Sequence, residues 1–573
     1  MQLTQRLRIP AVCCALAVLL CGVVSRPIST MSFVDDGPYI LMAHTLATTG
    51  HIVYNGWATA MLGWQLYLGA AFIKLFGFSF TAVRSSTLLV AMLLAFILQR
   101  TLVLAGITER NATIGTLAFV LSPLYLVLSV SFMTDIAGLF AVVVCFYGCL
   151  RALQSRTDWA TVAWLWFSVL CNALCGTSRQ IAWLGILVML PCALWLLRRR
   201  RRVLIPGSIA TLAGALFIFA CMHWFSLQPY AQPEHLLVNR FPAGHVFWEL
   251  VHSLLDVPFL LLPLIALFLP SVRRSRPRVV ATVVVTTLAY LFVALYPSHL
   301  RGNFPLEPAL NDWINVHGTF EFVFMKGVPP LFLPKALQIL LLLVALGGSF
   351  GFLIVLFSPR AASEPGDAPT GVSWHQLLVL TAPFVVANML LLLPRAATTG
   401  ITERYLLEPI VVALPCLIRC YQDRVNVRLP AVSFVLIACM AFFGIVLTHD
   451  LFSFYRARVA LVEELSAAGV PATAVDNGWE YNTSVELQHA AYINNYRMVL
   501  PPHAYTPTPP PPPGNCPMSD FDEFPHIQPV YGVSFSPDAC YGLASFAPVH
   551  YSRWPYRTPG TLYVVRYVPT SKQ

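Results

Sequence analysis

The chain has 573 residues, of which 57% are hydrophobic and only 11% are charged, and it carries a formal net charge of +10. Soluble globular domains are about a quarter charged, so this composition excludes an ordinary soluble protein, and its apolar content also excludes a disordered chain. The 14 cysteines are too diluted along this length for a disulfide-stapled secreted scaffold. The sequence therefore indicates one large membrane-embedded body.

Apolar runs of about 20 residues, long enough to cross roughly 30 Å of hydrocarbon, recur along the chain. We predict thirteen such spans, at residues 9–25, 80–105, 112–130, 135–153, 159–176, 180–197, 204–225, 246–270, 279–297, 331–357, 373–394, 401–420 and 429–449. A further run, 57–76, is broken by polar residues and glycines, and it is predicted to lie along the membrane interface.

Basic residues set the orientation of these spans, because cytoplasmic loops carry an excess of lysine and arginine. If the N-terminus is cytoplasmic and 57–76 does not cross, three arginine-rich loops lie inside, at 198–202, 273–278 and 419–428. We therefore predict a multi-pass plasma membrane protein, of the bacterial inner membrane, in which the net charge reflects topology and not nucleic-acid binding. The first run also fits a cleaved signal peptide, but we favour a retained anchor.

Residues 451–573 differ in composition from the predicted membrane domain, 1–450, and are predicted to form a small α/β domain outside the cytoplasm. The fold class is thus mainly α, with about thirteen transmembrane helices. The predicted elements of the C-terminal part are a helix over 456–468, a strand over 472–475, a Pro-rich segment over 501–514 with polyproline II at 509–513, and a strand over 561–568. Cys516 and Cys540 are the candidates for a disulfide, since this side of the membrane is oxidising.

Charged residues are almost absent from the predicted spans and gather at their outer ends. They occur in the first outer loop, 26–79, and at later outer junctions, as Asp35, Asp36, His44, Arg84, Asp135, Arg179, Glu403 and Arg404. Ionisable groups at a membrane boundary are candidate functional residues by default. A carboxylate can act as a general base or bind a divalent metal ion, and an arginine can bind phosphate oxygens in bidentate fashion.

Each of these residues also has a structural interpretation. Adjacent aspartates are common in a solvated turn, and Asp135 suits the positive end of a helix macrodipole. Arg179 could anchor a span at the lipid headgroups, and Arg404 could pair with Glu403 or Glu408.

The conjunction of four segments resembles the GT-C glycosyltransferases, a family of integral-membrane enzymes, and within it the bacterial family 39 (RgtA/B/C/D-like) type, related to protein mannosyltransferases and aminoarabinose transferases. The segments are the acidic first loop Asp35–Tyr39, the entry to the second span at 75–86, the acidic junction 122–135 and the arginine–tyrosine motif 403–407. The family often has Asp-Glu in its first loop where this chain has Asp35-Asp36. That difference leaves open which aspartate is the base.

This resemblance implies a transferase that moves a sugar from a polyprenyl-phosphate donor to a lipid, glycan or protein acceptor outside the cytoplasm, with inversion. It implies Asp35, Asp36 and Asp135 as catalytic residues and Arg84, Arg179 and Arg404 as ligands of the donor phosphate, with Tyr39, His44, Glu403 and Tyr405 as substrate contacts. A divalent metal is an optional cofactor, and Asp35, Asp36 or Asp135 would hold it. Membrane lipids are the other expected partners. From its amphipathic position alone, and not from the resemblance, the run 57–76 is expected to line a groove for the lipid tail.

Two other classes of function stay open. A transporter or flippase of lipid-linked saccharide would place ionisable residues near the bilayer midplane and often shows internal repeats. A non-catalytic scaffold for cell-envelope polymers would use the C-terminal part for binding. The outer position of the charged residues favours the transferase.

Overall fold

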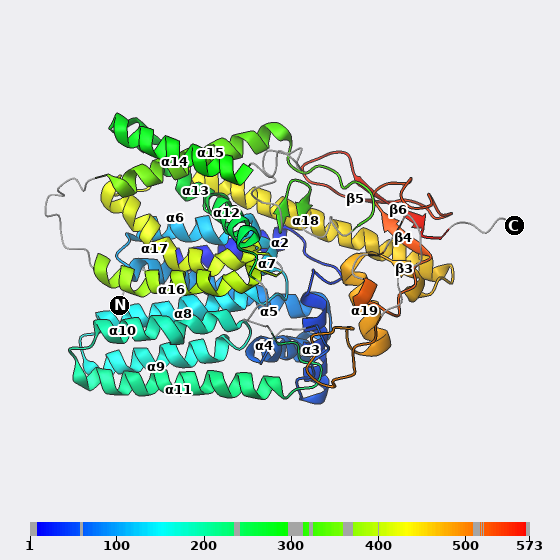
Figure 1. Ribbon diagram of the computed structural model, residues 1–573, viewed down its shortest axis with the longest axis horizontal. Coiled ribbons are helices and arrows are strands. Elements are labelled where there is room, and N and C mark those ends of the chain that lie inside the picture. The colour runs from blue at the N-terminus through cyan, green and yellow to red at the C-terminus, as the bar shows by residue number, and fades with distance from the viewer. Residues whose placement is uncertain are drawn as a thin grey trace.

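The computed structural model describes residues 8–57, 61–233, 241–274, 276–295, 313–319, 325–358, 371–398, 400–507, 516, 518 and 521–568. Within these residues, helices form an elongated bundle, and strands gather at one end of it (Figure 1). The N-terminal half of the bundle contains α2 (Ile9–Val24), α5 (Phe80–Leu104), α6 (Glu109–Val120), α7 (Pro123–Ser129), α8 (Asp135–Gln154), α9 (Asp158–Cys175), α10 (Leu190–Leu196) and α11 (Arg201–Ser226). The C-terminal half contains α12 (Ala243–Leu260), α13 (Leu262–Ile265), α14 (Pro277–Leu295), α15 (Lys335–Phe357), α16 (Trp374–Ala396), α17 (Leu407–Arg424) and α18 (Val432–Ala467).

The chain is a multi-pass membrane protein. Among the described residues, eight helices are long and apolar enough to cross a membrane, or ten if two bent helix pairs are each counted as one span. Three further predicted spans coincide with shorter apolar helices, at Ile9–Val24, Gln180–Leu196 and Pro277–Ala289. Each predicted span thus coincides with a helix or a helix pair, but length and apolarity alone do not establish thirteen crossings.

Two spans predicted as continuous are broken, and proline explains both breaks. The helices α6 and α7 meet at 69°, and α12 meets α13 and the following turn at 72°. Pro123 and Pro263 each stand in the first turn of the second helix, where the missing N–H costs nothing and favours a new start. Ser122 caps α7 by accepting a hydrogen bond from the backbone N–H of Tyr125. The spans predicted over 112–130 and 246–270 are therefore bent helix pairs, each of which can still be counted as one span.

Two short helices of the first loop, α3 (Asp36–Thr49) and α4 (Trp64–Phe76), lie at the end of the bundle nearest the strands (Figure 1). With 13 residues, α4 is about 20 Å long, which is too short to cross a bilayer. The side-chain amide of Gln65 donates to the carbonyls of Phe132 and Met133, at 3.0 and 3.2 Å. A Cβ on Gly69 would lie 2.7 Å from the ring of Phe132, so the close approach of α4 to this junction requires glycine.

The C-terminal part contains a four-stranded sheet in the order β3 (Val475–Asp476), β4 (Tyr531–Ser534), β6 (Gly560–Arg566) and β5 (Val549–Tyr551). The pair β3–β4 is parallel, and the other two pairs are antiparallel. The helix α19 (Gly478–Ala490) follows β3, and Cys516 forms a disulfide with Cys540. The strand predicted at 561–568 coincides with β6, whereas half of the Pro-rich segment, including 509–513, lies outside the described residues.

The C-terminal part packs directly on the bundle because α18 runs on past the predicted last span. This helix is continuous for 36 residues, so the helix predicted over 456–468 is present, but it is the end of α18 and not a separate element. Near its middle, Phe454 stacks on Phe535 of the C-terminal part, with ring centroids 5.5 Å apart, and meets Tyr551 edge-on at 5.7 Å. Side chains of the sheet therefore belong to the same hydrophobic core as the bundle.

Candidate active site

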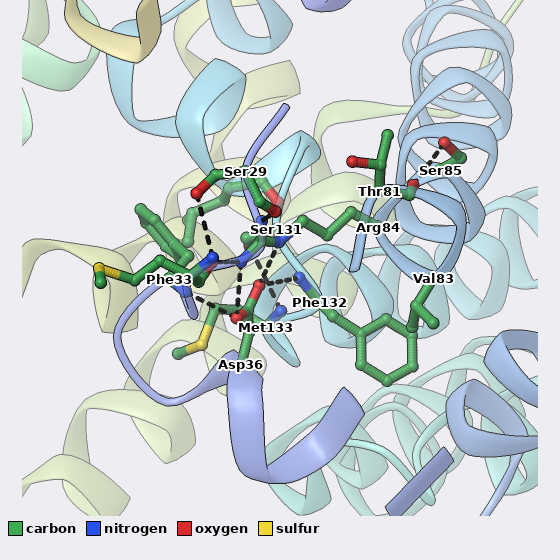
Figure 2. Close-up of polar contacts among 12 residues, drawn as sticks. Ser29, Phe33, Asp36, Thr81, Val83, Arg84, Ser85, Ser131, Phe132 and Met133 are labelled. Carbon is green, nitrogen blue, oxygen red and sulfur yellow. Dashed lines mark hydrogen bonds and ion pairs between the residues drawn. The ribbon is translucent and has the colours of Figure 1, made fainter. Parts of the chain in front are cut away.

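Asp36, the first residue of α3, forms a buried bidentate ion pair with Arg84 of α5. The two side chains meet through Arg84 Nε and Asp36 Oδ2 at 2.7 Å, and through Nη2 and Oδ1 at 3.0 Å. The same carboxylate accepts hydrogen bonds from the backbone N–H groups of Phe33 and Phe132, at 2.7 and 3.1 Å. Figure 2 shows Asp36 between these three partners. It thereby ties the first loop both to α5 and to the junction that precedes α8.

The partners of Arg84 and Asp36 leave little capacity for a ligand. Arg84 also donates to the backbone carbonyls of Ser29 and Met31, at 3.3 and 2.8 Å. The exposed fraction of the side chain is 3% for Arg84 and 0% for Asp36. The structure thus places these two predicted site residues together, but in a contact that holds the loop in place.

Asp35 immediately precedes α3, and its side chain points to different partners. Its Oδ2 lies 3.9 Å from Nη2 of Arg404, and 20% of the Asp35 side chain stays exposed. Burial raises the pKa of the Asp35 carboxyl above its ordinary value, while the Arg404 guanidinium and a hydrogen bond from the Trp479 side chain act to lower it. The side chain of Asp35 does not cap α3. Asp35 therefore combines partial access with an unusually high affinity for a proton.

A second carboxylate, Asp135, begins α8 and lies between two arginines. Its Oδ1 is 2.8 Å from Nη1 of Arg179, and its Oδ2 is 3.6 Å from Nη1 of Arg404. Arg179, in the turn after α9, also approaches Glu408 of α17, with Nε 2.6 Å from Oε1. We call Asp35, Asp135, Arg179, Arg404 and Glu408 the charged cluster. It joins the starts of three helices, where the macrodipole favours negative charge.

Aromatic rings line the arginines of the charged cluster. The Tyr405 ring centroid lies 5.0 Å from the guanidinium carbon of Arg404 and 5.3 Å from that of Arg179. Arg404 also donates from Nη2 to the Tyr405 hydroxyl at 3.1 Å, and its guanidinium lies 4.6 Å from the Trp313 ring. Cation–π contacts of this kind hold a guanidinium in place without using its hydrogen-bond donors.

Several buried polar atoms of the charged cluster have no well-aligned hydrogen-bond partner within the described part of the chain. They are Oδ2 of Asp135, Nε of Arg404 and Oε2 of Glu408, with the hydroxyls of Ser178 and Thr402 close by in the sequence. Native proteins leave few such atoms, so a group of them calls for an explanation. A polar ligand that inserts among these side chains would satisfy them.

The remaining predicted contacts lie at different distances from this centre. Tyr39 is buried within electrostatic reach of Arg404. Glu403 is buried too, but it accepts a hydrogen bond from the backbone N–H of Trp313 at 2.9 Å. His44 stacks on Phe78, with ring centroids 4.0 Å apart. The described contacts of Arg404 are with Asp35, Asp135 and aromatic rings, and Glu408 pairs with Arg179 instead.

The predicted metal ligands do not gather into a metal site. Asp36 is saturated by Arg84 and two backbone N–H groups, and Asp135 faces arginines on both sides. Among the described residues, no group of three or more histidine, cysteine, aspartate or glutamate side chains could hold a metal ion. These residues therefore do not fit a protein-held divalent cation.

Three residues at this centre were not predicted as site residues. Glu408 pairs with Arg179, and Arg395 acts electrostatically on Asp35 with its guanidinium 4.4 Å from the Tyr405 ring. The Trp479 side chain acts to lower the pKa of the Asp35 carboxyl. Glu408 stands five residues after Glu403 at the start of a predicted span. An ionisable residue at that position could have been predicted as a site residue from the sequence. Trp479 carried no such signal, because only the fold brings α19 to the first loop.

The chain is similar to several solved transferase structures. The structure of ArnT from Cupriavidus metallidurans bound to undecaprenyl phosphate has 13% identity and a TM-score of 0.39, covering 97% of this chain and 99% of that one. The oligosaccharyltransferase from Archaeoglobus fulgidus has 12% identity and a TM-score of 0.35, covering 79% of this chain and 59% of that one. For the protein O-mannosyltransferase Pmt1-Pmt2 complex from S. cerevisiae, bound to its sugar donor, the values are 12% and 0.30, covering 39% of this chain and only 33% of that one.

No protein-family model and no curated protein matches the chain. Because folds host many chemistries, the function has to follow from the side chains of the site.

Proposed function

We propose that this chain is a membrane glycosyltransferase that moves a sugar from a polyprenyl-phosphate donor to an acceptor on the extracytoplasmic face. The observation that carries the proposal is the convergence of Asp35, Asp135, Arg179 and Arg404, which come from four separate segments, through contacts of 2.8, 3.6 and 3.9 Å. A transferase of this kind needs a base for the acceptor and fixed cations for the leaving phosphate. The charged cluster supplies both.

In this mechanism Asp35 is the base. An acceptor hydroxyl or amine attacks the anomeric carbon, its proton passes to the Asp35 carboxylate, and the bond from that carbon to the phosphate oxygen breaks. The electron pair leaves with the polyprenyl phosphate, and the configuration at the anomeric carbon inverts. Of the two adjacent aspartates, Asp35 suits this role because it keeps 20% of its side chain exposed, whereas the Asp36 side chain is fully covered and paired.

Arg404 is the phosphate ligand that the geometry favours. Its ion-pair contacts, at 3.6 and 3.9 Å, are longer than normal hydrogen bonds, and its Nε has no partner among the described residues. Its donors can therefore turn to a phosphate without breaking a short pair. Arg179 has short contacts to Asp135 and Glu408 and holds the second carboxylate in place. Arg84 is assigned to loop positioning instead of phosphate binding.

The position of the cluster also bears on transport. Asp135 is the first residue of α8 and Glu408 lies in the first turn of α17, so these charges stand at the ends of candidate spans. Binding sites of secondary transporters lie near the bilayer midplane. The helix-end position therefore supports transfer over transport.

The proposal is tested by turnover of the full-length chain in proteoliposomes loaded with undecaprenyl-phosphate sugars, one hexose and one pentose, together with a membrane extract as the source of acceptor. We expect release of undecaprenyl phosphate by the native protein and a loss of at least 100-fold in the Asp35→Asn variant, the range typical of a missing general base. Donor that crosses the bilayer without being consumed would establish transport instead.

A further inference from the structure

Asn55 of the first loop is hydrogen-bonded both to α3 and to the C-terminal part. It lies between α3 and α4, and its exposed fraction is 7%. Its backbone carbonyl accepts a hydrogen bond from the N–H of Ile493 at 2.8 Å, and its side-chain amide donates to the carbonyl of Pro38 at 3.2 Å. Its side-chain oxygen accepts from the N–H of Trp57 at 3.3 Å. One buried residue thus connects a segment far along the chain to the first turn of α3.

The next residue, Gly56, allows the two segments to come this close. It adopts a φ of +77°, a conformation that favours glycine, and a Cβ there would lie 2.6 Å from the carbonyl oxygen of Ile493 and 3.1 Å from Sδ of Met498. Its backbone N–H donates to the carbonyl of Tyr230, just after α11, at 3.0 Å. Three segments that are distant in the sequence therefore meet at Asn55 and Gly56.

Apolar contacts bring α3 and the C-terminal part together beside this junction. The helix α19 packs on α3 (Figure 1). Ile493 and Phe524 belong to a small hydrophobic cluster of the C-terminal part, and Leu41 of α3 and Trp57 pack against it. Apolar burial has no preferred direction, whereas a hydrogen bond is directional. The bond from the Asn55 amide is therefore what fixes where α3 sits on this apolar surface.

The first turn of α3 is held from two sides. On one side the Asp36 carboxylate pairs with Arg84, with Nε 2.7 Å from Oδ2. On the other side Asn55 holds the carbonyl of Pro38, which stands three residues after Asp35. The side chain of Asp35 makes no capping hydrogen bond to α3. Its place is therefore set by the backbone of this turn and by the two anchors that hold it.

We propose that Asn55 is a positioning residue for Asp35, and that through Asn55 the C-terminal part sets the position of α3 in the transferase site. The inference rests on the proposed function and deepens it. Without the bond to Pro38, α3 keeps its anchor at Asp36 and can tilt about it. Asp35 faces Arg404 at 3.9 Å, and a tilt changes that separation. Small displacements of a catalytic group are costly in rate.

The test compares Asn55→Asp with Asn494→Asp in the full-length chain, with the proteoliposome assay above. Asn55→Asp keeps the shape of the side chain and the oxygen that accepts from Trp57, and it loses the N–H donor. Asn494 is the matched control, because it is only 3% exposed and its amide donates to the carbonyls of Thr506 and Asp522 at 2.7 and 2.9 Å. Both partners belong to the C-terminal part, so Asn494→Asp loses the same kind of bond away from α3.

We expect kcat to fall on the order of tenfold in Asn55→Asp, with KM for the donor unchanged because the phosphate ligand Arg404 does not lie on α3. Asn494→Asp is expected to keep the native kcat, even where its melting temperature falls as far. Gly56→Ala strains the same junction without adding a charge, and it is expected to lower kcat as Asn55→Asp does. A native kcat in Asn55→Asp, an equal loss in Asn494→Asp, or a loss that Gly56→Ala does not reproduce would overturn the inference.

Hydrogen exchange makes the test independent of turnover. In the full-length chain in lipid nanodiscs, exchange of the backbone amides of α3 is followed by mass spectrometry. We expect faster exchange in Asn55→Asp and native exchange in Asn494→Asp. If α3 exchanges at the native rate in Asn55→Asp, the bond to Pro38 does not hold the helix and the inference fails. If the native protein releases no undecaprenyl phosphate, the proposed function fails on its own, whatever the exchange shows.

Discussion

Asp35 and Asp36 are neighbours in the sequence, but the structure gives them opposite surroundings. The Asp36 carboxylate is fully buried and saturated by Arg84 and two backbone N–H groups, whereas Asp35 keeps 20% of its side chain exposed and faces Arg404 at 3.9 Å. The start of α3 explains the difference: Asp36 is the first helical residue and points back toward α5, and Asp35 lies just before it. One acidic pair thus supplies a positioning residue and a proposed base.

This difference predicts that Asp35→Asn and Asp36→Asn fail in different ways. Asp35→Asn removes the proposed base and leaves the fold intact, so we expect turnover to be lost and the melting temperature to stay within a few degrees. Asp36→Asn leaves the Arg84 guanidinium buried without its counter-charge, which costs on the order of 3–5 kcal/mol in the free energy of unfolding. Melting curves in detergent and turnover in proteoliposomes measure the two effects. Equal stability of both variants would contradict the assignment.

The two arginines of the charged cluster are also predicted to differ. Arg404 has long contacts, so Arg404→Lys keeps the fold but loses the planar guanidinium that suits a phosphate. We expect KM for the donor to rise at least tenfold with little change in melting temperature. Arg179 has short contacts to two buried carboxylates, so Arg179→Gln removes the ion-pair partner of Glu408, leaves Asp135 with the longer contact to Arg404, and lowers the melting temperature. Donor titrations and melting curves of Arg404→Lys and Arg179→Gln measure the two effects. A raised KM in the Arg179 variant together with a lowered melting temperature in the Arg404 variant would exchange the two roles.

The sequence predicted the helical membrane body and most members of the charged cluster, because apolar run length and outer-end charge are local properties. It could not tell Asp35 from Asp36, since both are carboxylates in one loop and only the fold brings Arg84 to one of them. Pro123 and Pro263 are sequence signals for a break in a helix, but the prediction of spans followed the uninterrupted apolar runs around them. Trp479 was beyond reach, because its effect on Asp35 joins segments that no spacing rule connects.

The raised pKa of Asp35 predicts the pH dependence of turnover. Burial is the main cause of the rise above the ordinary value of 3.8, and the Arg404 guanidinium is the main influence that opposes it. A general base acts as the carboxylate, so kcat is expected to fall as the pH drops through a pKa above 3.8. Removing the positive charge in Arg404→Gln raises that pKa further and moves the acid limb to higher pH. Profiles of kcat at saturating donor measure the limb, and a shift to lower pH in this variant would contradict the proposed base.

A glycine in α8 gives a test that changes no charge. A Cβ on Gly138 would lie 2.5 Å from Cδ of Arg179 and 3.1 Å from its Cβ, so Gly138→Ala pushes this arginine away from Asp135 and Glu408. We expect kcat/KM to fall on the order of tenfold or more, because small displacements at a catalytic centre are costly. Gly244 of α12 is the matched control, since a Cβ there meets nothing within 4 Å, and Gly244→Ala should keep full turnover. If Gly138→Ala were as active as Gly244→Ala, the position of Arg179 would not matter to the reaction, and Arg179 would leave the proposed site.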